Sequence, residues 1–375
     1  MITLGFEAKR AFKNFSGLGN YSRSLLRALA DHYPQYRYLL YTPPYAPHPA
    51  LGPMSQPDMH ICLPRGWGRS LPSLWRSYGI GPRLQKDGVG LFHGLSGELP
   101  FGIPKHIPAI VTMHDAIFMR YPQYYKAHDR YLYEKKFRYA CRRATKIIAI
   151  SKQTADDLMH YFQADSHKIE IVYQGCDPQF YSPATPEACV AVRTKYNLPE
   201  TFILSVGTIE ERKNTLNLVE ALSLLPEDCH LLLLGKATPY LPKVQAAVSK
   251  LGMGARVHFL HNALFSDFPA IYACARALVY PSVFEGFGIP VLEGLNVGIP
   301  VVTSNISSMP EAGGDAAAYI NPLQPSEIGH TLRQILENPK LANEMRHKGF
   351  AQALRFREDR VAHNVHEIYH QLLSK

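Results

Sequence analysis

Two glutamates that flank a glycine-rich turn are the residues of this chain best suited to chemistry. Glu285 and Glu293 enclose the sequence Gly-Phe-Gly-Ile-Pro-Val-Leu, and the apolar run Ala277–Tyr280 precedes them. Glycine lets the backbone approach a ligand and proline favours a first helical turn, so N–H groups and a helix N-terminus should point at one anion-binding spot. The two carboxylates can accept hydrogen bonds from vicinal hydroxyls. For an isolated pair, a surface acid and a helix-dipole partner are the simpler alternative.

A basic pair follows another apolar run, Phe202–Val206. Gly207 comes directly after this run, and Arg212 and Lys213 stand a few residues further on. Near the carboxyl end of a strand, an arginine fork and a lysine point charge are suited to neutralising a diphosphate. Solvated salt bridges to the neighbouring glutamates are an equally simple interpretation.

The N-terminal half contains weaker signals. Gly17 and Gly19, in the sequence Ser-Gly-Leu-Gly-Asn-Tyr, open an expected helix. They lack the third glycine of a dinucleotide-binding turn, which disfavours a nicotinamide dehydrogenase. His114 follows the apolar run Ala109–Met113, but a lone histidine there is more often structural than catalytic, and the chain has 17 histidines.

The elements that must position these residues alternate between short apolar runs and amphipathic helical stretches, which predicts parallel sheets with helices on both faces. The expected strands are 2–7, 36–42, 58–63, 89–93, 108–113, 145–150, 168–173, 202–206, 230–235, 257–259, 277–280, 301–304 and 317–320. The expected helices are 19–32, 71–83, 129–143, 151–163, 214–225, 241–251, 267–274, one from about 290, and C-terminal helices.

A proline-containing connector over 181–187 interrupts this alternation, which then restarts. We therefore expect an α/β protein of two Rossmann-like, doubly wound parallel-sheet domains, one over 1–180 and the other over 181–357. The last helix, about 358–375, is expected to pack back onto the first domain. Because ligands of such sheets bind beyond the carboxyl ends of strands, the site is expected in a central cleft that the two domains face.

Composition excludes several classes of protein. The chain has 375 residues, of which 46% are apolar and 19% charged, so a disordered or collagen-like protein is ruled out. No apolar run approaches the roughly 18 residues of a membrane-spanning helix. The first residues indicate a strand and not a signal peptide. Six scattered cysteines without a C-x-x-C pair indicate reduced thiols of a cytoplasmic protein, and we expect no metal site.

The charge is concentrated in the first half. Residues 1–180 carry a net charge of +10 and residues 181–375 a net charge of −1. Such asymmetry suggests nucleic acid, phospholipid or a phosphorylated substrate as a partner, with a solubilising surface as the alternative. We find no nucleic-acid recognition motif. Two basic stretches with aromatic residues, Pro64–Tyr78 and Lys126–Lys146, prompt the hypothesis of peripheral contact with an anionic membrane at the inner face of the plasma membrane.

Taken together, the motifs resemble the family 4 retaining glycosyltransferases, which have the GT-B fold, over nearly the whole chain. The motif most specific to the family is the segment from Glu285 to Glu293. The other matching motifs begin at Ser16, Met113, Ala149, Val172, Gly207 and Ser308. The resemblance implies transfer of a sugar from a nucleoside diphosphate to an acceptor with retention of configuration. It further implies that 1–180 is the acceptor-side domain and 181–357 the nucleotide-sugar-binding domain. It also implies that no metal or other cofactor is needed.

The family pattern assigns roles to individual residues. Glu285 would contact the donor-sugar hydroxyls at the reacting face, and Glu293 would hold the ribose hydroxyls. Arg212 and Lys213, in the motif that begins at Gly207, would bind the diphosphate. Thr208 replaces an arginine found in many relatives, so this contact would depend on the basic pair alone.

The remaining assignments concern backbone groups and the N-terminal half. Backbone N–H groups of Phe287, Gly288 and Ile289 would reach the sugar and the distal phosphate. The glycines at 17 and 19 would let a loop close over the phosphates, and His114 would hydrogen-bond the sugar. Asn296 departs from the small residues usual after the second glutamate, and Glu311 is expected in a loop without an assigned role.

The motif forms look most like those of mannosyltransferases of polysaccharide synthesis. GDP-mannose is the first choice of donor and UDP-glucose the second, with a growing glycan or a lipid-linked sugar as acceptor. Two alternatives stay open: a sugar-nucleotide epimerase or hydrolase on the same fold, and a basic nucleic-acid-binding protein.

Overall fold

The computed structural model describes residues 1–15, 17–48, 51 and 58–374; Ser16 of the first glycine motif lies outside the described residues. The chain divides into two compact units, one formed by Met1–Gly175 with Arg357–Lys375 and the other by Cys176–Phe356. Each unit contains one parallel sheet. The predicted fold class, two Rossmann-like parallel-sheet domains, is confirmed.

The sheet of the N-terminal unit has seven strands in the order β3-β2-β1-β4-β5-β6-β7. The strands are β1(Ile2–Glu7), β2(Tyr36–Tyr41), β3(Met59–Cys62), β4(Val89–Gly94), β5(Ala109–Met113), β6(Lys146–Ala149) and β7(Ile169–Ile171). All pairings are parallel; Ile2 lies opposite Tyr36 and Ile110 opposite Lys146. Strands covered on both faces are expected to be nearly continuously apolar, as the fully buried central strand β5 is.

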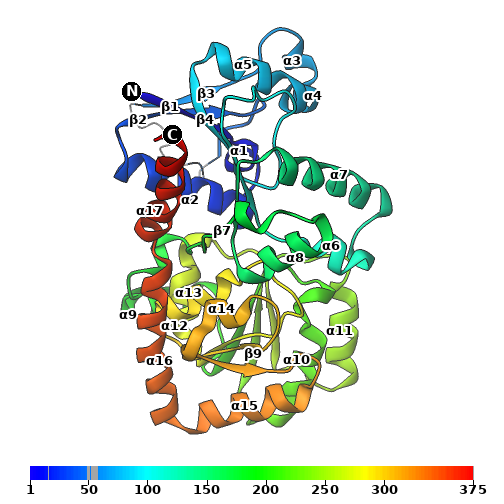
Figure 1. Cartoon of the computed structure of the whole chain (residues 1–375). Coiled ribbons are helices and arrows are strands. Elements are labelled where there is room, and N and C mark those ends of the chain that lie inside the picture. Colours follow the sequence, from blue (N-terminus) through cyan, green and yellow to red (C-terminus); the bar gives the residue numbers. More distant parts are fainter. Residues whose placement is uncertain (16, 49–50, 52–57, 375) are drawn as a thin grey trace. The chain divides into compact units, whose positions relative to one another are not determined.

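Helices cover both faces of this sheet (Figure 1). They are α1(Lys9–Lys13), α2(Gly17–His32), α3(Trp67–Ser70), α4(Pro72–Leu74), the π-helical turn η2(Trp75–Gly79), α5(Ile80–Lys86), α6(Ile117–Arg120), α7(Ala127–Arg143), α8(Lys152–Phe162) and α17(Glu358–Leu373), with the 3₁₀ turns η3(Pro122–Tyr124) and η4(Ser166–Lys168). One core cluster joins α2 and α17 to β1 and β2, and a second joins α5, α7 and α8 to the opposite face.

The returning helix α17 lies along α2 (Figure 1). Tyr369 is fully buried and its hydroxyl lies 2.6 Å from Nδ1 of His93 on β4. His366 stacks on Tyr33 with ring centroids 3.7 Å apart. The unit boundaries fall after Gly175 and after Phe356, beside the boundaries near 180 and 357 that the sequence suggests.

The C-terminal unit has a six-stranded parallel sheet in the order β10-β9-β8-β11-β12-β13. The strands are β8(Phe202–Val206), β9(His230–Leu234), β10(Val257–Leu260), β11(Ala277–Tyr280), β12(Val301–Ser304) and β13(Ala317–Ile320). The helices are α9(Pro186–Tyr196), α10(Thr215–Ala221), α11(Leu241–Lys250), α12(Phe268–Cys274), α13(Ile289–Val297), α14(Met309–Gly313), α15(Pro325–Glu337) and α16(Pro339–Ala353). The 3₁₀ turns are η5(Pro178–Phe180), η6(Glu211–Lys213), η7(Leu222–Leu224), η8(Phe265–Asp267), η9(Gly314–Ala316) and η10(Leu354–Phe356).

Several elements differ from the sequence predictions. The helix expected over 71–83 is split into α4, η2 and α5. Helix α9 begins inside the segment interpreted as a connector; Thr185 caps it by accepting a hydrogen bond from Ala188 N at 3.2 Å, and Pro186 follows in the first turn. That Thr-Pro-Glu sequence is a helix-start signal that the prediction did not use. Glu311 lies in α14 rather than in a loop.

Among the described residues, no helix combines the length and the hydropathy needed to cross a membrane.

Candidate active site

The charged residues singled out in the C-terminal half come together at one edge of its sheet. Strand β8 leads to Arg212 and Lys213 in η6, and strand β11 leads to Glu285. The two strands are parallel neighbours, with Leu278 opposite Leu204. Because parallel neighbours end at the same edge, the loops that follow them meet beyond their carboxyl ends.

One oxygen of Glu285 is the centre of this cluster. Its Oε1 lies 2.6 Å from Lys213 Nζ and 2.6 Å from Arg212 Nη1. The same oxygen accepts from the Tyr280 hydroxyl at 2.8 Å and the Ser282 hydroxyl at 2.6 Å. Burial alone would raise the pKa of Glu285, but the two cations outweigh it and hold that pKa well below its ordinary value. Burial in turn lowers the pKa of Lys213, and Glu285 opposes the shift.

Arg212 also ties the two loops together. Its guanidinium donates to the Phe284 carbonyl oxygen at 2.8 Å and to Glu210 Oε1 at 2.6 Å. Its own carbonyl oxygen accepts from Val283 N at 2.9 Å. The alternative interpretation, a salt bridge from the basic pair to a neighbouring glutamate, is therefore correct for Arg212 and Glu210. The same guanidinium also pairs with Glu285, so this salt bridge is part of the larger cluster.

Backbone geometry makes room for these charges. Gly207 has φ 139°, a conformation that favours glycine, and a Cβ there would lie 3.2 Å from Lys213 Cε. Gly288 has φ 108° and caps α13, with Pro290 in the first turn. Phe287 is buried and packs on Phe356 with ring centroids 5.4 Å apart, so its side chain belongs to the core.

The second glutamate, Glu293, is buried inside α13 at 7% exposure. The Tyr272 hydroxyl donates a hydrogen bond to its Oε2. Burial raises the pKa of Glu293 to about 7, and the bond from Tyr272 only partly opposes this shift. Asn296, which departs from the family pattern, packs without difficulty: its Nδ2 donates to the Leu292 carbonyl oxygen at 2.9 Å.

Sequence reasoning missed the hydroxyl groups of this site. Tyr280 is the last residue of β11 and Ser282 follows it, so their place at a strand's carboxyl end was the available signal. Ser307 and Ser308 come from the loop after β12, and their hydroxyls donate to the Glu285 carbonyl oxygen at 2.8 and 2.9 Å. Together these four residues fix the main chain and the side chain of Glu285.

In the N-terminal unit, His114 follows β5 and is buried. Its Nε2 donates to the Leu95 carbonyl oxygen at 3.0 Å, which leaves Nδ1 as the acceptor nitrogen. The ring of Tyr21 packs edge-on at 4.7 Å. Burial lowers the pKa of His114 to about 4, so the imidazole is neutral near pH 7. His114 lines a cavity of about 180 Å³ within this unit.

The two glycines of the N-terminal motif differ in what surrounds them. Both lie in the first turn of α2, not in a loop. A Cβ on Gly19 would come within 1.7 Å of the Asn14 carbonyl oxygen, so packing alone requires this glycine. A Cβ on Gly17 would meet nothing within 4 Å, so packing does not require this glycine.

Comparison with known proteins identifies the class. The family described as Glycosyltransferase Family 4 matches residues 15–180, and that described as Glycosyl transferases group 1 matches residues 192–352. O-antigen chain mannosyltransferase B of Escherichia coli is 31% identical over 272 residues, covering 71% of this chain and 70% of that protein. The chain belongs to glycosyltransferase family 4 and is a glycosyltransferase.

Two further matches agree. Serotype-specific mannosyltransferase WbdA of Escherichia coli is 29% identical over 303 residues, which span 76% of this chain but 36% of that longer protein. The crystal structure of Anabaena HepE with UDP and glucose is similar in fold, with a TM-score of 0.78 and 17% identity over 99% of this chain and 100% of that one. The predicted family and the GT-B fold class are thus confirmed.

The pKa of Glu293 predicts how stability depends on pH. The folded protein binds this proton more tightly than the unfolded chain, so the contribution is fully present below about pH 4.5 and is lost as the pH rises to about 7. The contribution of this proton to the free energy of unfolding is on the order of 3 kcal/mol. Melting temperatures of wild type and Glu293→Gln, measured from pH 4.5 to 8, should show wild type losing stability relative to the variant as the pH rises, because glutamine has no proton to lose. The exposed Glu211→Gln serves as control, and parallel curves for all three proteins would contradict the prediction.

The charge cluster predicts a large loss of stability when its anion is removed. Glu285→Gln removes the carboxylate that Arg212 and Lys213 share, leaving only Glu210 beside Arg212, and should lower the unfolding free energy by about 3–5 kcal/mol. Adding Lys213→Met to this variant should restore part of the loss. Urea unfolding of the three proteins, beside Glu211→Gln, tests the prediction; a loss no greater than that of the control would show that the cluster contributes little.

Proposed function

We propose that this glycosyltransferase moves a hexose from a nucleoside diphosphate onto a glycan or lipid-linked acceptor in cell-surface polysaccharide synthesis, with retention of configuration. Mannose from GDP-mannose is the first choice and glucose from UDP-glucose the second. The observation that carries the proposal is the buried cluster of Arg212, Lys213 and Glu285 where two neighbouring strands end. It offers two cations for a diphosphate beside a carboxylate for sugar hydroxyls.

The proposed chemistry is mainly electrostatic. As the bond between sugar and diphosphate breaks, negative charge grows on the leaving phosphate, and Arg212 and Lys213 stabilise it from fixed positions. The N–H groups at the start of α13, from Phe287 to Ile289, add the positive end of a helix. Losing one such charged contact typically slows turnover on the order of 100-fold.

Glu293 is proposed to hold the ribose. As a carboxylate it accepts hydrogen bonds from two vicinal hydroxyls, while Tyr272 donates to one of its oxygens. In the N-terminal unit, the acceptor nitrogen of neutral His114 is proposed to accept a hydrogen bond from the sugar. The acceptor hydroxyl attacks on the face from which the diphosphate leaves, and a phosphate oxygen takes its proton. In this proposal the arginine, the lysine and the helix N-terminus replace a metal ion.

The relatives support mannose in particular. Two of them are named as mannosyltransferases, one of the O-antigen chain and one serotype-specific. The HepE structure, which contains UDP and glucose, is the reason to keep UDP-glucose as second choice. The matches to glycosyltransferases favour transfer over an epimerase or hydrolase and lend no support to a nucleic-acid-binding protein.

A thermal-shift panel identifies the donor. GDP, UDP, ADP and their sugars are added with EDTA present to wild type, Lys213→Ala and Glu293→Ala. A ligand at about 100 times its Kd adds roughly 2.7 kcal/mol to stability. The nucleotides of one base should therefore raise the melting temperature of wild type clearly and that of neither variant. Both variants must themselves show a cooperative melt. If no nucleotide shifts wild type, the donor site proposed here is wrong.

Contact with an anionic membrane is a second part of the proposal, carried by the surface of α3 and α4. Trp67, Leu71, Leu74 and Tyr78 are about half exposed, between 49% and 57%, although no membrane-crossing helix accompanies them. Arg65 and Arg69 are exposed beside them. Two neighbours counted in this stretch, Trp75 and Arg76, are buried and do not contribute.

Vesicle sedimentation tests this surface. Wild type should bind phosphatidylglycerol vesicles, lose binding as salt rises, and bind phosphatidylcholine vesicles weakly, because each base near an anionic surface contributes about 1 kcal/mol. Replacing Trp67 and Arg69 by alanine should reduce binding, while Leu323→Ser, an exposed apolar position of the other unit, should not. Equal, negligible sedimentation with both lipids would rule out the membrane contact.

A further inference from the structure

The cavity beside His114 has an aromatic wall. Phe118 of α6 packs edge-on against Phe137 of α7 with ring centroids 5.0 Å apart, and Tyr133 lies 5.6 Å from Phe118. Tyr125, ahead of α7, completes the wall. These rings pack on one another, so they form a rigid apolar surface of the kind that lines small-molecule sites.

The cavity is also lined by a carboxylate whose two oxygens are each held by a cation. Oε2 of Glu98 accepts from Arg76 Nη2 at 2.8 Å, and Oε1 accepts from Lys136 Nζ at 3.1 Å. Glu98 and Lys136 both line the cavity. Burial would raise the pKa of Glu98, but Arg76 and Lys136 more than offset it and keep the group ionised.

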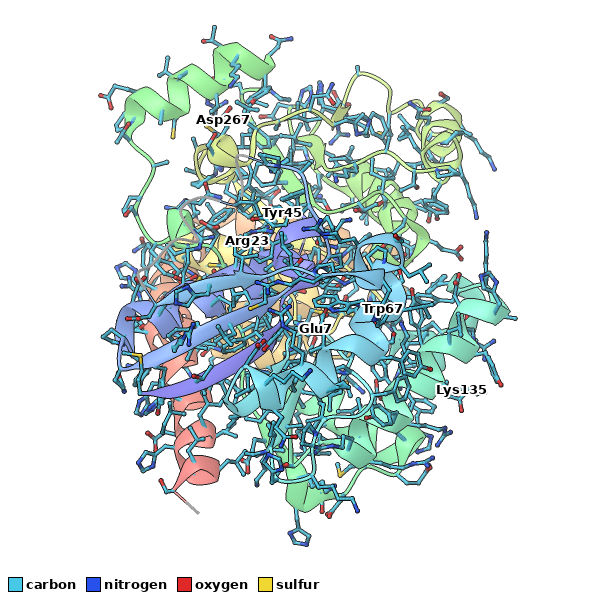
Figure 2. The ribbon with its side chains drawn as sticks, turned by 90° about the horizontal axis from the view of Figure 1, so that it is seen from above. Glu7, Arg23, Tyr45, Trp67, Lys135 and Asp267 are labelled. Carbon is cyan, nitrogen blue, oxygen red and sulfur yellow. The ribbon has the colours of Figure 1, made fainter. Side chains whose placement is uncertain are left out.

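Arg76 is held in turn by Glu7, at the end of β1. Its Nη1 lies 3.7 Å from Oε1 of Glu7, which is 2% exposed. Neither carboxylate oxygen of Glu7 has a hydrogen-bond partner among the described residues. Glu7, Arg76, Glu98 and Lys136 line a second cavity of about 20 Å³, room for about one water. Figure 2 shows Glu7 inside the N-terminal unit and Lys135, the neighbour of Lys136, projecting from the outside of α7.

The formal charges around the larger cavity cancel. Arg10 and Lys136 are its cationic residues, Glu98 and Asp115 its anionic ones, and His114 is neutral. A phosphate or carboxylate on the ligand would meet the carboxylates of Glu98 and Asp115, while Arg76 and Lys136 are already paired with carboxylates, which disfavours it. Sugar hydroxyls, in contrast, can donate to Glu98 and accept from Lys136. The +10 charge of this half of the chain is therefore not gathered here.

We propose that this cavity binds the terminal unit of the acceptor as a single neutral sugar ring, with the Glu98–Lys136 pair selecting its hydroxyls and the aromatic wall covering its apolar face. The inference rests on the proposed function and adds the class of acceptor to it. A volume of about 180 Å³ lies below the roughly 300–1,000 Å³ of sites for larger ligands, so one ring fits and an oligosaccharide does not. Glu7 acts as a positioning residue, because it reaches the ligand only through Arg76 and Glu98.

The first experiment measures transfer to synthetic acceptors. Octyl hexosides are compared with the same compounds bearing a 6-phosphate or a 6-carboxylate, using the nucleotide sugar that stabilises the protein. Neutral hexosides should accept the sugar and both charged forms should fail. Glu98→Gln and Lys136→Met should raise the acceptor KM roughly 10–100-fold, the cost of a lost hydrogen bond to a charged group. Lys135→Met and Glu134→Gln, on the same helix, are the matched controls.

The positioning role of Glu7 has its own readout. Glu7→Gln should raise the acceptor KM with little change in kcat and no change in the donor-induced thermal shift. A variant that merely unfolds would lose all three together. Equal use of charged and neutral acceptors, or an unchanged KM in Glu98→Gln, would overturn the acceptor inference and leave the donor site intact.

A second measurement separates this inference from the proposed function. Saturation-transfer NMR with methyl hexosides and their 6-phosphates needs no donor and no turnover. Signals from the neutral sugars that vanish in Glu98→Gln support the cavity even if no nucleotide sugar binds, which would refute only the donor proposal. Absence of neutral-sugar signals in wild type, or stronger signals from the phosphates, would overturn the inference.

Discussion

A single carboxylate oxygen organises the site of the C-terminal unit. Oε1 of Glu285 lies 2.6 Å from both a lysine and an arginine nitrogen, and all three side chains are less than 20% exposed. Either cation, buried without its partner, would be costly, and the carboxylate alone would be protonated. The cluster therefore forms as a whole, and it links the segment after β8 to the loop after β11. The backbone turns at Gly207 and Gly288 are consistent with this constraint, because each brings a loop close to it.

Much of this site was within reach of the sequence. The strands over 202–206 and 277–280 have their predicted bounds because both are short apolar runs that end at glycine or proline. The motifs placed Arg212, Lys213 and Glu285 just after these strands. That the three charges meet on one oxygen could not be predicted from the residues alone, because it depends on β8 and β11 being neighbours. Strand order is a tertiary property that local patterns do not carry.

The helix predicted over 71–83 is split because packing in the folded protein overrides the local preference for a continuous helix. Trp75 is only 4% exposed, and a Cβ on Gly79 or Gly68 would lie 2.4 or 2.7 Å from its ring. The chain widens into a π-helical turn where this indole is buried, and the adjacent Arg76 is directed to the buried glutamates instead of to solvent. A basic, aromatic stretch thus divides into an exposed part and a buried part, which composition alone could not distinguish.

The return of α17 to the N-terminal unit has a consequence for synthesis. The unit formed by Met1–Gly175 and Arg357–Lys375 is interrupted in sequence, whereas Cys176–Phe356 is continuous. On a ribosome adding about 5–20 residues per second, the apolar face of α2 waits roughly 15–70 s for Val365, Ile368 and Tyr369. The second unit can complete its core during that interval. Folding order is therefore expected to run against chain order, with the N-terminal unit finishing last.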